Sequence, residues 1–222
     1  MDMIEAFNED PVDVEAMHAD AGDKFLVVGL GASAGGVQAL RSFFSHVPAD
    51  TNMAYVVILH LSPDHDSQLA EVLQGASLLP VTKVERRTRL EPDHVYVIPP
   101  NKSLEIKNGH IVVLNITSHE VRRAPVDILF RSLAQSHGPR AVSVVLSGTG
   151  ANGSMGMKRV KEMGGICILY KGCSDDECLT DDCARTIRTI RTRRRREGAL
   201  LPNGLSRRTE RHVAGHSGTQ LL

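Results

Sequence analysis

The stretch that decides the fold is FLVVGLGASAGG, residues 25–36. An apolar, partly β-branched run from Phe25 to Leu30 ends in a glycine-rich turn that holds Ser33, and the helix-like segment VQALRSFFSHV follows at once. A buried strand, a tight turn and a helix form the unit from which parallel sheets are built. Such a turn presents either a nucleophilic hydroxyl or backbone amides that hold a phosphate.

Long apolar strands alternate with helix-like segments through the middle of the chain. The strand-like runs, each apolar and partly β-branched, are 25–31, 53–60, 141–148 and 166–170. The helix-like segments that follow or separate them are 36–46, 66–75, 125–137 and 154–163. Continuous apolar strands between helices are typical of a parallel sheet that is covered on both faces. We therefore predict an α/β protein with a doubly wound, mainly parallel sheet.

A shorter β region interrupts this pattern in the first half of the chain. Its strand-like segments are short and lie at 81–85, 95–100, 103–108 and 110–115. The last two segments are joined by Asn108-Gly109, a strong hairpin signal. We expect a small β-hairpin insertion in the α/β domain.

Composition and charge exclude several classes of function. The 222 residues are 41% hydrophobic and 23% charged, with a formal net charge of zero and no Trp. Neither a bulk attraction to nucleic acid nor a base-stacking platform follows from such a chain. No apolar run approaches the roughly 20 residues of a membrane span, and the acidic N-terminus lacks the pattern of a secretory signal. We expect a cytoplasmic protein without membrane insertion and without a nucleic-acid partner.

The cysteines argue against a metal centre. They are spaced more widely than the CxxC pairs of zinc sites, and they are Cys167, Cys173, Cys178 and Cys183. We expect reduced thiols, with Cys167 in a buried strand, and no bound metal.

Three loops are expected to meet at one edge of the sheet. Right-handed crossovers place the loops after the first three long strands at the carboxyl edge, where open α/β sheets bind their ligands. These loops carry Ser33, His60 and Asn152. A serine nucleophile needs a base, and the base needs a third group that fixes its tautomer. Each residue alone has a simpler interpretation, as a turn serine, a packed histidine or a turn asparagine.

The glycines also match a dinucleotide-binding fingerprint loosely. Their spacing, Gly29-x-Gly31-x3-Gly35-Gly36, departs from GxGxxG. No acidic residue closes the next strand, where ribose recognition would need one. Nucleotide binding therefore ranks below hydrolysis.

Five sequence blocks resemble one known family when they are taken in order. The blocks are GLGASAGGVQAL, VVILHLSPDH, PPNKSLEI, RRAPVDILFRSLA and VVLSGTGANGSMGM. They resemble the chemotaxis protein-glutamate methylesterases of the CheB type, most closely the esterase module of methylesterase–methyltransferase fusion proteins. The resemblance covers about residues 24 to 169.

The resemblance implies an activity and a set of catalytic residues. It makes Ser33 the nucleophile and His60 the general base, and it aligns Asn152 with the aspartate of the family pattern G-x-G-x-D-G. The reaction that it implies is hydrolysis of glutamyl methyl esters on the cytoplasmic helices of chemoreceptors, with release of methanol and without a metal or an organic cofactor. A methyltransferase module is a further partner that the resemblance suggests.

The asparagine is the main departure from the family pattern. A neutral amide supplies no charge to the imidazolium and favours the wrong tautomer, so we expect a weakened esterase. The alternative is a catalytically degenerate or truncated receptor-binding relic. No residue clearly replaces the missing carboxylate, and the remaining candidates nearby are Asp64, Asp66 and Asp127.

Two arginines precede one of the predicted helices. Arg122 and Arg123 lie in the loop after the hairpin, which the resemblance places towards the active edge. They are either contacts for acidic receptor helices or solvated surface residues.

The chain divides into three regions. We expect a polar leader at 1–23, a catalytic domain at 24–170 and a divergent, disordered, Arg-rich tail at 171–222. The tail is either a basic segment for an acidic partner or, as we favour, the product of a frame change that truncates the domain. Truncation would leave the core around Cys167 less buried. The leader is shorter than the roughly 120 residues of a phospho-receiver domain, which implies a lack of that control.

Overall fold

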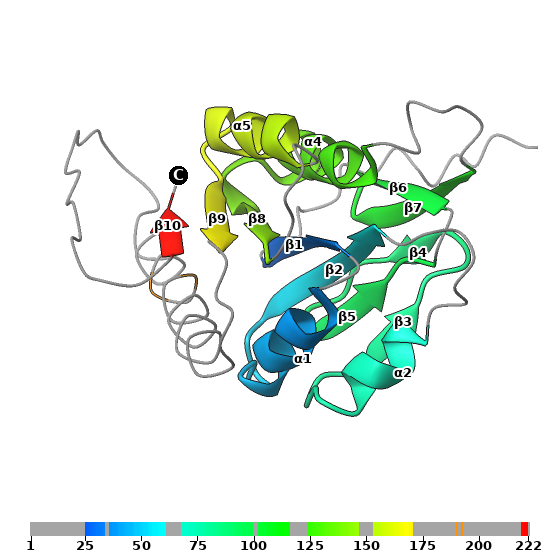
Figure 1. The fold of residues 1–222 in the computed structure, drawn as a ribbon. Coiled ribbons are helices and arrows are strands. Elements are labelled where there is room, and N and C mark those ends of the chain that lie inside the picture. Colours follow the sequence, from blue (N-terminus) through cyan, green and yellow to red (C-terminus); the bar gives the residue numbers. More distant parts are fainter. Residues whose placement is uncertain are drawn as a thin grey trace, which may run out of the picture.

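One large, mostly parallel sheet forms the centre of the protein. The computed structural model describes residues 25–33, 36–60, 68–99, 102–115, 124–146, 153–170 and 219–221, with Ile190 and Thr192. In this part of the chain the sheet has seven strands in the order β10-β9-β8-β1-β2-β5-β3 (Figure 1). Their bounds, in chain order, are β1 (Leu26–Ser33), β2 (Met53–His60), β3 (Val81–Lys83), β5 (His94–Val97), β8 (Ala141–Val145), β9 (Ile166–Tyr170) and β10 (Thr219–Leu221).

Neighbouring strands run parallel, except for β10, which is antiparallel to β9. Helices cover both faces of the sheet (Figure 1). Helices α1 (Val37–Ser45) and α2 (Leu69–Gln74) lie on one face, and α4 (Pro125–His137) and α5 (Ser154–Glu162) lie on the other. The predicted doubly wound α/β architecture is confirmed.

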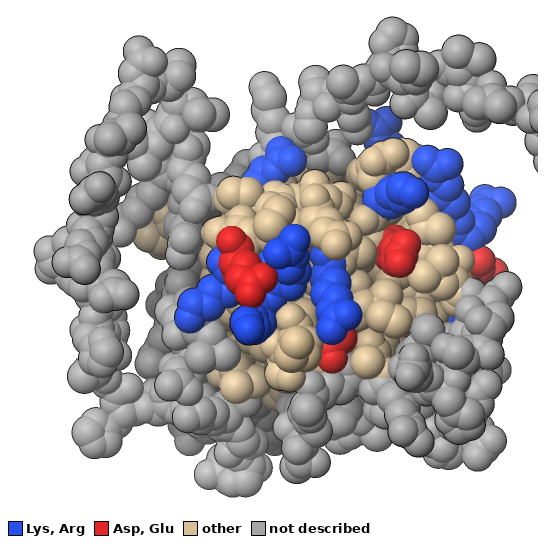
Figure 2. All heavy atoms as spheres, turned by 90° about the horizontal axis from the view of Figure 1, so that it is seen from above, with Lys and Arg blue, Asp and Glu red and all other residues tan. Residues whose placement is uncertain are grey.

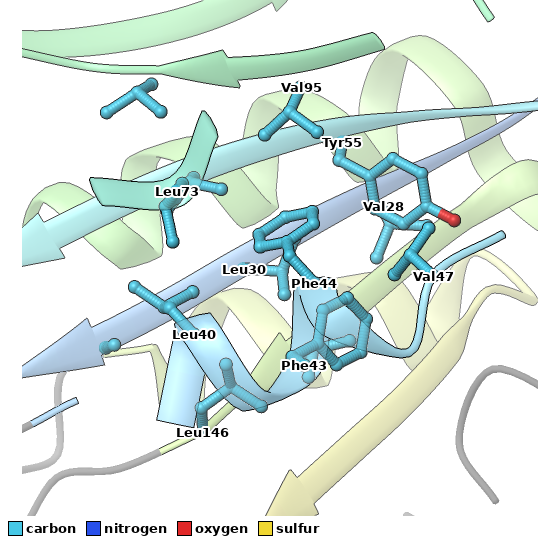
Figure 3. Close-up of a cluster of buried hydrophobic side chains, with 14 of the residues drawn as sticks. Val28, Leu30, Leu40, Phe43, Phe44, Val47, Tyr55, Leu73, Val95 and Leu146 are labelled. Carbon is cyan, nitrogen blue, oxygen red and sulfur yellow. The ribbon is translucent and has the colours of Figure 1, made fainter. Parts of the chain in front are cut away.

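The core on the α1 face is rich in aromatic side chains (Figure 3). Phe43 and Phe44 of α1 and Tyr55 of β2 are nearly solvent-free and pack edge to face, with ring centroids 5.3–6.4 Å apart. Leu40, one turn earlier in α1, joins them because residues three and four apart share a helix face. This packing holds α1 against strands β1 and β2 of the sheet.

The core on the α4 face depends on two glycines of β1. A Cβ at Gly29 would lie 3.1 Å from a methyl of Leu133, and a Cβ at Gly31 would lie 2.5 Å from a methyl of Val126. Helix α4 therefore packs close to β1 because these positions have no side chain. The close packing of α4 explains why Gly29 and Gly31, two of the glycines that loosely match a nucleotide fingerprint, carry no side chain. A bound nucleotide is not needed to explain them.

The expected hairpin is present as a second, three-stranded sheet. Strands β4 (Thr88–Arg89), β6 (Lys102–Lys107) and β7 (His110–Asn115) form it in the order β4-β7-β6. Asn108 and Gly109 both have positive φ, +50° and +69°, as a tight hairpin turn requires. The sheet is fastened to α4, since the Ile106 backbone N–H donates to Oγ of Ser132 at 3.0 Å. The two-residue strand β4 has no sequence signal of its own and forms only against β7.

Some element boundaries differ from the expected ones. Helix α2 begins at Leu69 and β8 ends at Val145, so both are shorter than the apolar pattern predicts. A single 3-10 turn, η3 (Gly138–Arg140), connects α4 to β8. Pro139 and the positive φ of Gly138 end the helix at this point.

Short segments of the tail region belong to the described fold. Residues 219–221 form β10 on the edge of the sheet, and Ile190 is 1% exposed within the α1-side core. Cys167 is also 1% exposed, so the core around it is covered, contrary to the expected consequence of truncation. Burial raises the pKa of its thiol, which donates to the Met157 carbonyl at 3.1 Å. The other cysteines, the leader and the rest of the tail lie outside the described residues.

Candidate active site

The backbone places the predicted serine and histidine next to each other. Ser33 is the last residue of β1, and His60 is the last residue of β2. The two strands are parallel neighbours, and Ser33 and His60 are register partners. Neighbouring strands lie about 5 Å apart, so the two Cα atoms are separated by one inter-strand spacing at the carboxyl edge of the sheet.

The loop that carries Asn152 connects the carboxyl end of β8 to the amino end of α5. Leu146 leaves β8 with its backbone N–H donating to the Gly31 carbonyl at 3.1 Å. At the other end of the loop, Gly153 precedes α5 with φ +103°, a conformation that side chains rarely tolerate. Asn152 itself lies outside the described residues. The positions that flank its loop therefore both belong to the edge that carries Ser33.

One valine joins the end of β1 to the start of α5. Cγ1 of Val126 would lie 2.5 Å from a Cβ at Gly31 and 3.1 Å from a Cβ at Gly153. Gly31 is two residues before Ser33, and Gly153 directly follows Asn152. Val126 therefore packs between the backbone segments that lead into two of the predicted catalytic positions.

The side chain of Asp127 binds to the start of helix α5. This aspartate lies in the first turn of α4 and is 8% exposed. Its Oδ1 accepts the Gly156 backbone N–H of α5 at 2.6 Å. Asp64 and Asp66, the other candidates for the missing carboxylate, lie outside the described residues, as do Arg122 and Arg123.

Helices α1, α4 and α5 of the described part of the chain begin at this edge. Helix α1 starts four residues after Ser33, and α4 and α5 also have their amino ends at the carboxyl edge of the strands (Figure 1). Helix amino ends carry unpaired N–H groups and a partial positive charge. The edge is therefore suited to stabilising negative charge that develops on an oxygen.

Among the histidines that the structure describes, the two with clearly shifted pKa values lie elsewhere. Burial lowers the pKa of His94, which begins β5, and lowers the pKa of His137, the last residue of α4, to about 4. Both residues are at the amino edge of the sheet, away from His60. Their titration is therefore separate from the chemistry at the serine edge.

Neither a metal cluster nor a membrane-spanning helix is found in the described parts of the chain. Their His, Cys, Asp and Glu side chains do not gather in threes as metal ligands would. None of their helices has the length and apolar character needed to cross a membrane.

These features define an α/β protein whose parallel sheet holds a serine and a histidine at neighbouring strand ends on its carboxyl edge. A family model described as CheB methylesterase matches residues 28–186. The chain belongs to the CheB methylesterase family.

Individual relatives agree with this assignment. A protein-glutamate methylesterase/protein-glutamine glutaminase of Hydrogenovibrio crunogenus is 36% identical over 142 residues, which are 62% of this chain and 38% of the relative. One of the same name from Archaeoglobus fulgidus is 31% identical over 160 residues, 70% of this chain and 45% of the relative. The chain thus spans less than half the length of these curated relatives.

A solved structure has the same fold. It is the crystal structure of the Thermotoga maritima CheB methylesterase catalytic domain, with a TM-score of 0.63 and 22% sequence identity. The similarity covers 76% of this chain and 98% of that domain.

Sequence reasoning did not identify the contacts that Val126 and Asp127 make. Both residues stand in the block RRAPVDILFRSLA, and the available signal was an acidic residue in the first turn of a helix that opens with Pro125. That signal predicts a favourable charge on the residue's own helix. It does not show that the carboxylate reaches a second helix.

Proposed function

We propose that this protein is a serine hydrolase of the methylesterase type, which converts glutamate methyl esters on chemoreceptors to glutamate and methanol. The observation that carries the proposal is the register pairing of Ser33 with His60 at the carboxyl edge of a CheB-family domain. The names of the relatives, which are protein-glutamate methylesterases, support the same reaction. We assign the catalytic domain to residues 24–170.

The proposed reaction has two halves that use the same pair of side chains. His60 takes the proton of the Ser33 hydroxyl, and the oxygen attacks the ester carbonyl carbon. The tetrahedral intermediate then expels the methoxy group, which leaves as methanol with the proton from His60. Water, deprotonated by His60, cleaves the resulting acyl–serine and releases the glutamate carboxylate and free Ser33. No step needs a metal or an organic cofactor.

The oxyanion of each tetrahedral intermediate needs donors at the same edge. Backbone N–H groups of the turn between Ser33 and α1 are the nearest candidates in sequence, and the amino end of α1 adds a favourable dipole. Donors of this kind are preorganised, so they stabilise charge without reorganising during the reaction.

The third catalytic position limits the rate. We assign it to Asn152, where the family pattern has aspartate. In a serine protease the same change lowers turnover by about 10⁴, because an amide neither steadies the imidazolium nor enforces the productive tautomer. The proposed enzyme is therefore slow, and Asn152, with the divergent tail sequence, favours the second candidate function, a receptor-binding relic without catalysis.

The charge on one face suits an acidic protein partner. Lys and Arg side chains gather over the face formed by α4 and α5 (Figure 2). The basic residues on these helices and on η3 that reach the surface are Arg131, Arg140, Lys158, Arg159 and Lys161. Of the acidic side chains there, Glu162 pairs with Arg159 at 3.3 Å and Asp127 is buried.

We propose that this basic face, together with Arg122 and Arg123, meets the cytoplasmic, glutamate-bearing helices of methylated receptors. The site of action is accordingly the cytoplasm. A methyltransferase module, which would restore the esters that this domain removes, is a further proposed partner.

Methanol release from methylated receptor tests the proposal. Wild type, Ser33→Ala and Asn152→Asp are compared at equal concentration, and labelling by a fluorophosphonate probe reports the nucleophile directly. We expect slow release by wild type, none by Ser33→Ala and much faster release by Asn152→Asp. If both the wild type and Asn152→Asp bind receptor but are neither labelled by the probe nor release methanol, the receptor-binding relic is established instead.

A further inference from the structure

A buried carboxylate joins the two helices that begin at the proposed active edge. Oδ1 of Asp127 in α4 accepts the Gly156 backbone N–H of α5 at 2.6 Å, and the aspartate is 8% exposed. Gly156 is the third residue of α5, so its N–H is one of the donors that a helix leaves unpaired at its amino end. Gly153, in the N-cap position, has no side chain to accept it. Asp127 therefore supplies from another helix the cap that α5 lacks.

The contact leaves little freedom for α5 to slide. A Cβ at Gly156 would lie 3.0 Å from the Asp127 carbonyl oxygen and 2.6 Å from Cβ of Phe130. The two helices thus touch backbone to backbone at this point, with the N–H to carboxylate bond between them. A charged acceptor makes such a bond roughly twice as strong as a neutral one. The amino end of α5 is therefore fixed to α4 both sterically and electrostatically.

This junction, at Gly156, lies four residues after the proposed third catalytic position. The Met157 backbone N–H donates to the Gly153 carbonyl at 2.8 Å and so starts the helix from Gly153. Gly153 is held against Val126, the residue before Asp127. Asn152 directly precedes Gly153. The same Val126 packs against Gly31, two residues before Ser33. Consecutive residues of α4 therefore hold the segments that lead to both positions.

We infer that Asp127 is a positioning residue for position 152. Its carboxylate holds the start of α5, and α5 follows directly on Gly153 and position 152. The inference rests on the proposed function. In it, Asp127 positions residue 152, the third catalytic group, and does not take over the role of that group. The hydrogen-bond partner of Asp127 is the start of α5, so we assign Asp127 to holding that helix.

A double-mutant cycle on the full chain tests this role. The readout is the rate at which a fluorophosphonate probe labels Ser33, in the wild type and in Asn152→Asp, each with and without Asp127→Ala. We expect Asn152→Asp to raise the rate, and we expect Asp127→Ala to reduce that gain at least tenfold. Asp127→Asn keeps an oxygen acceptor for the Gly156 N–H and is expected to retain most of the gain.

Asp93 provides the matched control. Its Oδ1 also accepts a backbone N–H, from Asn52 at 2.5 Å, and the Thr51 hydroxyl at 2.8 Å, but at the amino edge of the sheet. Asp93→Ala removes a comparable carboxylate bond far from position 152. It is expected to lower the melting temperature and to leave the gain from Asn152→Asp unchanged.

The possible outcomes distinguish a failure of the positioning role of Asp127 from a failure of the proposed esterase function. A folded Asp127→Ala that keeps the whole gain overturns the positioning role and leaves the esterase proposal standing. An Asn152→Asp variant with no gain, or labelling that survives Ser33→Ala, overturns both. If Asp127→Ala does not fold, Asp127→Glu decides, because it keeps the charge but displaces the acceptor by one methylene. We expect it to lose part of the gain, and an undiminished gain would refute the role.

Discussion

The buried histidine at the end of α4 makes the protein sensitive to mild acid. His137 is 5% exposed, and burial lowers its pKa to about 4, with a smaller contribution from the positive charge of Arg140. Its Nδ1 has no hydrogen-bond partner within the described residues. The carboxyl end of a helix favours a protonated histidine by up to about 2 kcal/mol, but here desolvation outweighs that effect.

The size of the effect follows from the two pKa values. A drop from 6.5 in the unfolded chain to about 4 in the folded protein is about 2.5 pKa units, or about 3 kcal/mol at 1.36 kcal/mol per unit. The folded-state pKa is depressed, so this stability is complete above pH 6.5 and is lost as the pH falls towards 4. By pH 5 the loss is already about 2 kcal/mol.

Urea unfolding of wild type and His137→Gln at pH 7, 6 and 5 measures this loss. The wild type should lose about 2 kcal/mol more between pH 7 and pH 5 than the variant, whatever the variant costs at pH 7. Gln135→Ala is the control, since this exposed side chain on the same helix does not titrate and its replacement should leave the pH dependence at that of wild type. Equal pH dependence in wild type and His137→Gln would refute the reasoning.

Two further predictions concern packing and recognition. Gly31→Ala places a methyl 2.5 Å from Val126, so it should lower the free energy of unfolding by about 1–3 kcal/mol and slow probe labelling, whereas Gly75→Ala, whose nearest new contact is 3.6 Å away, should be close to neutral. Thermal unfolding with labelling rates measures both, and an unaffected Gly31→Ala would contradict the close packing of α4 on β1. Lys158→Glu on the basic face should raise the KM for methylated receptor about two- to five-fold, with kcat unchanged and the difference shrinking at high salt. Lys107→Glu on the hairpin serves as its control, and equal KM changes in the two variants would argue against docking on α4 and α5.

The sheet and the serine–histidine pair were predictable because their signals are local or nearly so. Apolar runs identify buried strands, Asn108-Gly109 specifies a tight turn, and the handedness of crossovers brings successive strand ends to one edge. The register of Ser33 with His60 then follows from the parallel pairing of β1 with β2. Position 152 remains a prediction, since only the residues that flank its loop are described.

Other features of the protein required the tertiary structure. Strand β10 pairs with β9 although a polar, Arg-rich segment separates them, and no local pattern reveals which distant strand will cover an open edge. The glycines of β1 are ambiguous in sequence between a phosphate-binding loop and a helix contact, and only the position of α4 decides between the two uses.

The amino-acid sequence by itself determined the fold class, the order of the elements and the edge at which Ser33 and His60 meet, because periodicity and turn chemistry act over a few residues. Only the tertiary structure decided what holds that edge in place. The bond from Asp127 to Gly156 joins residues 29 positions apart, and its partner is a backbone N–H that every residue type except proline possesses. The residue type at position 156 therefore does not predict the donor, and the contact can be identified only from the packing of the two helices.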